Sequence, residues 1–94
     1  MSETTPPFRL RVAVSADKDL ARLPEKAAAA IAEFMIGALC DNPYRVGKAL
    51  RGDQTGRFTA RRGPYRLIYE IDEEQRIVRV LHADHRADVY RPRS

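Results

Sequence analysis

The residues best suited to chemistry lie around a Gly63-Pro64 turn, in the stretch GRFTARRGPYRLIY. Arg61 precedes the turn and Arg66 follows it. If two strands meet at this turn, the two arginines lie at the same end of a hairpin and could share one concave face. Two guanidinium groups repel each other there unless an anion lies between them, and their planar forks match phosphate. The pattern therefore predicts a phosphate-binding site.

A second reactive segment, HADHRADVY, occupies residues 82–90. His85 can act as base or acid near neutral pH. Tyr90 could stack on a nucleobase, or transfer a proton if cationic neighbours lower its pKa from about 10. Arg86 adds positive charge. Cleavage of a phosphodiester without a metal needs a base, an acid and cations around the phosphate. Since no His/carboxylate set has metal-ligand spacing, we expect no cofactor.

Charge is divided unevenly along the 94 residues. Residues 1–44 hold five Lys/Arg and six Asp/Glu, whereas residues 45–94 hold twelve and seven, and eleven of those twelve cations are arginines. A polyanionic partner for the second half is one interpretation, and an ordinary solubilising surface is the other. The chain has no apolar run long enough to span a membrane and no signal-peptide pattern, so we expect it in the cytoplasm.

The elements that must position these residues begin with a strand over residues 8–14, where apolar and charged residues alternate. Ser15 is expected to cap a short helix, and Pro24 separates it from an Ala-rich helix over residues 25–40. The predicted core stripe of the second helix comprises Ala27, Ile31, Phe34, Met35 and Ala38. Cys40 is expected to be a reduced, buried residue.

Asp41-Asn42-Pro43 ends the second helix, and residues 43–56 are predicted to be a loop. Strands follow at residues 57–62, 65–71 and 76–82, and residues 86–90 could add a short fourth. The order predicts an α+β fold: an N-terminal strand, two helices, then three to four antiparallel strands, with both helices on one sheet face. We assign residues 8–90 to one domain, 1–7 to a disordered leader and 91–94 to a short tail.

The stretches VGKALRGDQTGRFTARRGPYRLIY and HADHRADVY resemble the RelE superfamily of bacterial toxins, and the likeness runs from about Phe8 to Tyr90. It implies a RelE-like fold and a ribosome-dependent mRNA endoribonuclease, with Arg61 and Arg66 on the scissile phosphate and proton transfer or stacking by residues 82–90. It also implies a RelB-like antitoxin that neutralises the toxin and supplies the operator-DNA contacts of the complex. Residues expected to contact RNA or the ribosome are Lys48, Arg51, Arg57 and Arg62.

Alternatives remain open at this level. The ParE branch shares the fold but inhibits DNA gyrase and cuts no RNA, and a degenerate relative would bind antitoxin without activity. Many RelE relatives have Lys or Arg near the position of Thr59, and some have a basic residue at the position of Asp84, so these two residues keep the degenerate alternative open. Residues with an ordinary structural interpretation are Arg61 and Arg66 (paired with Glu70 or Asp88), His85 (paired with Asp84 and Asp88), Tyr90 (packed on the sheet), Tyr65 and Tyr69 (core), His82 (structural) and Lys48 (a solvated loop residue).

Overall fold

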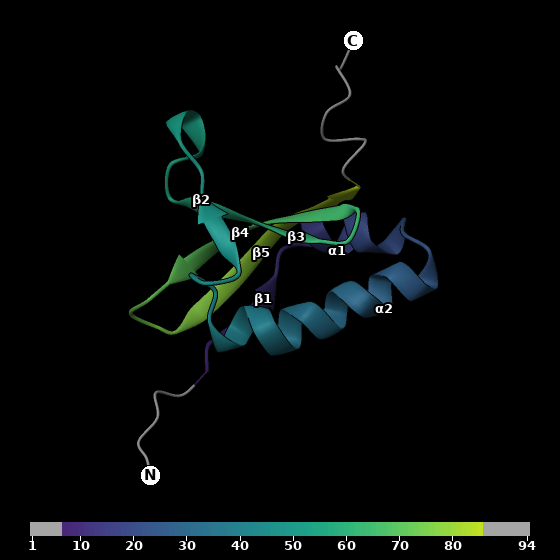
Figure 1. Ribbon diagram of the computed structural model, residues 1–94, viewed down its shortest axis with the longest axis horizontal. Helices are drawn as coiled ribbons and strands as arrows, with labels where there is room; N and C mark the ends of the chain where they lie inside the picture. The colour runs from purple at the N-terminus through teal and green to yellow at the C-terminus, as the bar shows by residue number, and fades with distance from the viewer. Residues whose placement is uncertain (1–6, 86–94) are drawn as a thin grey trace.

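A computed structural model describes residues 7–85 and shows a five-stranded sheet in the order β1-β5-β4-β3-β2, with two helices packed against it (Figure 1). β1 runs parallel to β5, and the other neighbours are antiparallel, so the sheet is mixed. The predicted α+β class and element order are confirmed. The elements are β1 (Arg9–Val12), α1 (Val14–Ala21), α2 (Glu25–Phe34), β2 (Gly47–Ala49), β3 (Arg57–Arg62), β4 (Tyr65–Asp72) and β5 (Ile77–His85).

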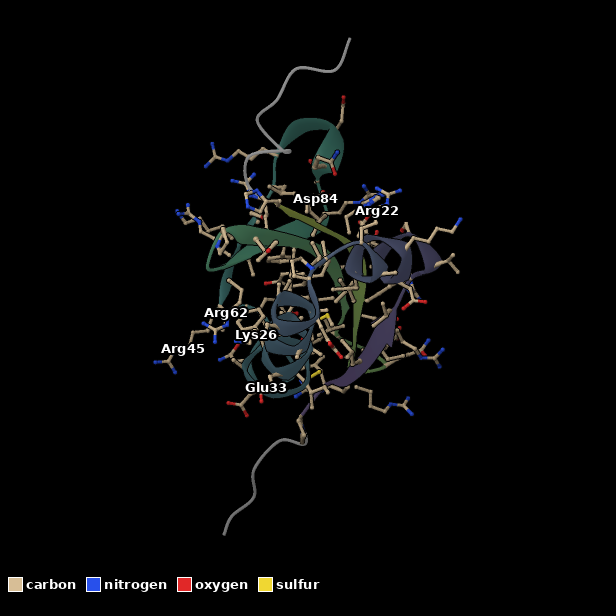
Figure 2. All side chains as sticks on the ribbon, turned by 90° about the vertical axis from the view of Figure 1, so that its right-hand side faces the viewer. Arg22, Lys26, Glu33, Arg45, Arg62 and Asp84 are labelled. Carbon is tan, nitrogen blue, oxygen red and sulfur yellow. The ribbon has the colours of Figure 1, made fainter. Side chains whose placement is uncertain are left out.

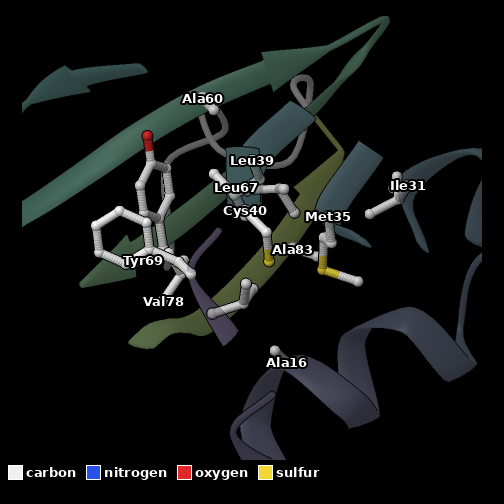
Figure 3. Packing of buried hydrophobic residues seen from close by; sticks show 12 residues of the cluster. Ala16, Ile31, Met35, Leu39, Cys40, Ala60, Leu67, Tyr69, Val78 and Ala83 are labelled. Atoms are coloured by element: carbon white, nitrogen blue, oxygen red, sulfur yellow. The ribbon is translucent and has the colours of Figure 1, made fainter. Parts of the chain in front are cut away.

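The two faces of this sheet differ in chemistry. We call the helix-covered side the core face and the other side the open face. Core-face side chains pack with the helices in one buried cluster (Figure 3), which includes Ile31, Leu67, Tyr69, Val78 and Val80. Since side chains alternate along a strand, the residues between them point to the open face. The open face carries Lys48, Arg57, Thr59, Arg61, Arg66, Ile68, Glu70, Arg79 and Asp84.

A β-bulge changes the alternation in β5. Ile68 pairs with His82 and Tyr69 pairs with Val80, so Leu81 is the extra residue. Beyond the bulge Ala83 is buried beside Leu67, and Asp84 lies opposite Arg66. The strand is also longer than the predicted 76–82, and it starts one residue later because Arg76 has a positive φ of 57° in the hairpin turn.

Helix α1 completes the edge of β5 where β1 stops. The backbone N–H of Ala13 donates to the Val80 carbonyl at 2.9 Å, and then the chain turns into the helix. The Ser15 hydroxyl donates to the Leu81 carbonyl at 2.6 Å. The Asp19 carboxylate accepts the Ala83 N–H at 3.0 Å. Two predictions are therefore wrong: Ser15 pairs with the sheet instead of capping α1, and the strand does not reach Val14, which is the exposed first residue of that helix.

The second helix changes its winding at its C-terminal end. The α-helix ends at Phe34, and Met35–Leu39 forms a π-helical turn with wider hydrogen bonding. The wider turn buries Leu39 and Cys40 and leaves Ala38 exposed, so Ala38 does not belong to the predicted core stripe. Cys40 is a free, buried thiol, as predicted, and burial raises its pKa.

The predicted loop over residues 43–56 contains an edge strand, β2, and a short 3₁₀ turn, Gly52–Gln54. Three residues of β2 pair with β3, and Lys48 lies opposite Thr59. The sequence pattern did not predict β2, because this strand is only three residues long and begins with a glycine. Gly47 is required where it stands, since a Cβ there would overlap the Tyr69 hydroxyl and lie 2.7 Å from the Thr59 carbonyl oxygen.

Within residues 7–85, none of the helices has the length and apolar character needed to cross a membrane. The predicted leader over residues 1–7, the possible strand at 86–90 and the tail at 91–94 lie wholly or almost wholly outside the described residues.

Candidate functional site

A basic hollow opens on the sheet at the end where β3 turns into β4. Its volume is about 240 Å³, and its lining residues are Lys48, Thr59, Ala60, Arg61 and Arg66. Arg61 and Arg66 are cross-strand partners, so the tight turn does bring both guanidinium groups to one place. Among the residues that the structure describes, the lining holds three cationic side chains and no carboxylate. A phosphate group has the charge and the acceptor geometry that this lining can bind.

The turn that sets the arginine pair depends on Gly63, whose φ of 61° suits a residue without a Cβ. The third cation comes from β2, so Lys48 belongs to a strand and not to the predicted loop. Because β2 pairs only through Gly47–Ala49, its position depends on what holds its start.

Tyr69 holds the segment that leads into β2. Its ring is fully buried and stacks on Phe58 with centroids 5.7 Å apart. Its hydroxyl donates to the Pro43 carbonyl at 2.7 Å. Burial raises the pKa of Tyr69 to about 12, so the phenol is neutral at physiological pH. The expectation that Tyr69 is a core residue is confirmed, and its hydroxyl connects that core to the segment that precedes β2.

Thr59 also lines the basic hollow, and it is the cross-strand partner of Lys48. Its hydroxyl oxygen is buried and, among the described residues, has no hydrogen-bond partner. A hydroxyl can donate to a phosphate oxygen but adds no charge. Thr59 therefore adds no charge to the lining, where a lysine or arginine would add a cation.

The neighbouring part of the open face contains two ion pairs on one carboxylate. Glu70 lies 3.6 Å from the Arg57 Nε and 3.7 Å from an Nη of Arg79. Arg57 also donates to the Gln54 side chain at 3.1 Å. The sequence left open a pairing of Glu70 with Arg61 or Arg66, but its ion pairs in the structure are with Arg57 and Arg79. Sequence reasoning missed Arg79, since only strand register places it beside Glu70.

His85 lies against Tyr65, with the two rings edge to face and their centroids 5.2 Å apart. Tyr65 is only half-buried and lines a small hollow beside α2. Alternation beyond the bulge therefore puts His85 on the core side of the sheet end and Asp84 opposite Arg66. The structure does not bring His85 into the basic hollow. His82 has the structural role expected of it, with its Nδ1 3.3 Å from the Asp19 carboxylate.

The other predicted contact residues are dispersed. Arg62, labelled in Figure 2, lines the hollow of about 130 Å³ beside α2 and is not among the residues that line the basic hollow. Arg51 is exposed just before the 3₁₀ turn. Arg86 and Tyr90 lie outside the described residues. Of the predicted site, the structure thus brings Arg61, Arg66 and Lys48 together and places Arg57 in the adjacent ion-paired group.

The opposite end of the open face is acidic. A hollow of about 450 Å³ near the β4–β5 turn is lined partly by Glu70, Asp72, Glu73, Glu74 and Arg79. Glu73 also accepts the Tyr44 hydroxyl at 2.6 Å, a hydrogen bond that raises the Tyr44 pKa. The open face is therefore polarised along its strands, and it is most acidic at the β4–β5 turn.

Comparison with known proteins identifies the family of this chain. Residues 10–90 match the family model described as the ParE toxin of the type II toxin–antitoxin system parDE. Over 85 residues, 90% of this chain, the sequence is 49% identical to toxin RelG and 46% identical to toxin RelE, both from Mycobacterium tuberculosis strain ATCC 25618 / H37Rv. These alignments cover 98% of toxin RelG and 88% of toxin RelE.

Solved structures show the same likeness. The toxin–antitoxin complex RelBE2 from Mycobacterium tuberculosis contains a chain that matches with a TM-score of 0.84 and 47% identity, over 86% of this chain and 100% of that one. The intact RelBE toxin–antitoxin complex of E. coli matches with a TM-score of 0.69 and 20% identity, over 83% and 95% of the two chains. The second likeness concerns the fold alone.

Proposed function

Since this chain belongs to the ParE toxin family and is a type II toxin of the RelE/ParE superfamily, we propose that it is a ribosome-dependent endoribonuclease that cuts mRNA and so inhibits translation. The observation that carries the proposal is the basic hollow, where Lys48, Arg61 and Arg66 lie together and no carboxylate from residues 7–85 joins the lining. Close relatives named as RelE and RelG toxins support the same assignment.

The proposed reaction is an internal transfer at phosphorus that needs no metal. A base removes the proton of the 2′-hydroxyl, and the 2′-oxygen attacks the adjacent phosphate. The bond to the 5′-oxygen breaks as an acid protonates it, which leaves a 2′,3′-cyclic phosphate and a 5′-hydroxyl. Negative charge builds up on the phosphate oxygens, and preorganised donors stabilise that charge more than they stabilise the substrate. Arg61 and Arg66 would supply these donors.

Proton transfer is assigned in this proposal to the end of β5 and the residues after it. His85 and Tyr90 are the candidate base and acid, and Arg86 would add positive charge. Because His85 contacts Tyr65 in the structure, the geometry supports the phosphate-binding part of the proposal more directly than the proton-transfer part.

The proposed partners are a RelB-like antitoxin, the ribosome and mRNA. The neighbours from Mycobacterium tuberculosis and E. coli are toxin–antitoxin complexes, which supports an antitoxin for this chain as well. An antitoxin that covers the open face would block the basic hollow and neutralise the toxin in the cytoplasm. Operator binding by the complex would come from the antitoxin's DNA contacts.

Primer extension on a translating mRNA tests the proposal, with purified wild-type protein and the Arg66→Ala variant. We expect new cuts at ribosomal A-site codons and a loss of about 100-fold or more in the variant, as for removal of a transition-state donor. Arg22→Ala, at the exposed end of α1, is the matched control and should cut normally. Cuts that persist in Arg66→Ala would exclude the basic hollow as the site.

A ParE-like inhibitor of DNA gyrase is the second candidate, because the matching family model carries the ParE description. Growth arrest without mRNA cuts, together with inhibition of gyrase supercoiling by the purified protein, would support it. If the protein causes neither mRNA cuts nor growth arrest, it is an inactive relative that binds antitoxin.

A further inference from the structure

Strand register builds a second charged row across the open face. Arg57 on β3 pairs with Glu70 on β4, Glu70 pairs with Arg79 on β5, and Arg79 pairs with Arg11 on β1. One carboxylate therefore lies in a row with three arginines, across four neighbouring strands. We call this set the arginine row.

The ion pairs of the arginine row are weak enough to exchange. Their N···O separations of 3.6 and 3.7 Å exceed good hydrogen-bond distances. The side chains of Arg57, Glu70 and Arg79 remain 41%, 38% and 55% exposed. Exposed pairs of this kind contribute little to stability. An incoming phosphate could therefore take the place of Glu70 without loss of a structural contact.

The guanidinium groups of Arg57 and Arg79 nevertheless have partners that orient them. Gln54 accepts from Arg57 at 3.1 Å, and Glu70 draws Arg57 and Arg79 toward the same point. Glu70 thus occupies the position that a phosphate would take, and it presents carboxylate oxygens to the same donors.

The arginine row lies on the same face as the basic hollow, farther along the strands. Arg57 and Arg61 are four residues apart on β3, which is about 13 Å at strand spacing. The cross-strand pair of Thr59 and Ile68 lies between them. A small anion in the basic hollow would not reach Arg57 or Arg79. An extended polyanion that follows the strands would reach both sites, and RNA is the polyanion that the proposed function places there.

We propose that the arginine row is a second phosphate-contact site for the RNA strand held in the basic hollow, and that Glu70 is a built-in competitor that RNA phosphate must displace. This inference rests on the proposed function. The Glu70 carboxylate keeps Arg57 and Arg79 positioned, and it lowers the affinity of the toxin for RNA that is not held on the ribosome.

Fluorescence anisotropy with a short RNA made uncleavable by 2′-O-methyl groups tests the inference at several salt concentrations. Glu70→Gln should bind about fivefold more tightly, because one competing charge is gone. Arg79→Gln should bind more weakly, with a salt slope reduced by about one. Glu33→Gln changes net charge equally on exposed α2, where Figure 2 shows it away from the sheet, and should leave affinity near wild type.

Unchanged or weaker RNA binding by folded Glu70→Gln would overturn the inference, and thermal unfolding of each variant establishes that it is folded. Tighter binding of a polyglutamate peptide by Glu70→Gln, with RNA binding unchanged, would also overturn it and assign the row to a protein partner. The binding assay needs no cleavage, so it is separate from the Arg66→Ala test. If the arginine row does not bind RNA, the primer-extension assay still detects cleavage at the basic hollow. If the protein is not a nuclease, the primer-extension assay shows no cuts.

Discussion

The core face and the open face are built from the same three central strands, yet they hold their side chains in opposite ways. On the core face Leu67, Tyr69 and Val80 are fully buried, and the Tyr69 hydroxyl has a partner within the protein. On the open face Glu70 and Arg79 remain exposed and pair at long distance. Side-chain alternation therefore separates stability from chemistry at neighbouring positions of one strand.

Tyr69 links the two faces. Its ring contributes to the core, while its hydroxyl donates to the Pro43 carbonyl and lies beside Gly47, the first residue of β2. Because β2 carries Lys48, the position of one open-face cation depends on a core-face side chain.

The largest expected effect on stability is on the core face. Leu67→Ala should lower the free energy of unfolding by about 2–5 kcal/mol, since a fully buried leucine leaves a cavity. Arg61→Ala, an exposed residue of the neighbouring strand, should change it by less than about 0.5 kcal/mol. Urea unfolding measures both. Similar losses in the two variants would mean that the open face also carries stability.

A smaller effect should appear at high pH. Burial raises the folded-state pKa of Tyr69 from 10.0 to about 12, so the stability due to its neutral phenol is complete below pH 10.0 and is lost as pH rises toward 12. Two pKa units correspond to about 3 kcal/mol across that window. Tyr69→Phe should abolish this part of the pH dependence in urea unfolding.

Tyr69→Phe should also lower the free energy of unfolding by about 1–3 kcal/mol at neutral pH, because the Pro43 carbonyl loses its donor. Tyr44→Phe is the matched control, since the Tyr44 hydroxyl is on the surface and bonded to Glu73. If Tyr69→Phe kept the full alkaline slope and Tyr44→Phe lost it, the assignment to the core would be wrong.

The smallest effect is expected where α1 closes the sheet edge. Ser15→Ala should lower the free energy of unfolding by about 1 kcal/mol, because the Leu81 carbonyl loses its donor. Hydrogen exchange should then quicken at the β5 amides near the bulge. Thr55→Ala, which removes an exposed hydrogen bond to the Gly52 carbonyl, should leave these amides unchanged. Faster exchange confined to α1 would point instead to a helix cap.

Much of this molecule could be predicted from local patterns. The bounds of β3, the Gly63-Pro64 turn and the meeting of Arg61 with Arg66 depend on residues within ten positions of each other. Period-two alternation and turn residues encode these features directly. The helix pattern also located α2, though not the π-helical turn that ends it, because that turn follows from packing of Leu39 and Cys40.

The sequence by itself determined the α+β order, the central hairpin and the arginine pair, since each depends on short-range periodicity and turn chemistry. Only the tertiary structure decided the β5 bulge, the use of Ser15 as a sheet-edge donor, the strand that carries Lys48, and the Glu70 ion pairs with Arg57 and Arg79. Ser15 and Leu81, for example, are 66 residues apart. Such contacts depend on register and on the pairing of distant strands, which no local pattern specifies.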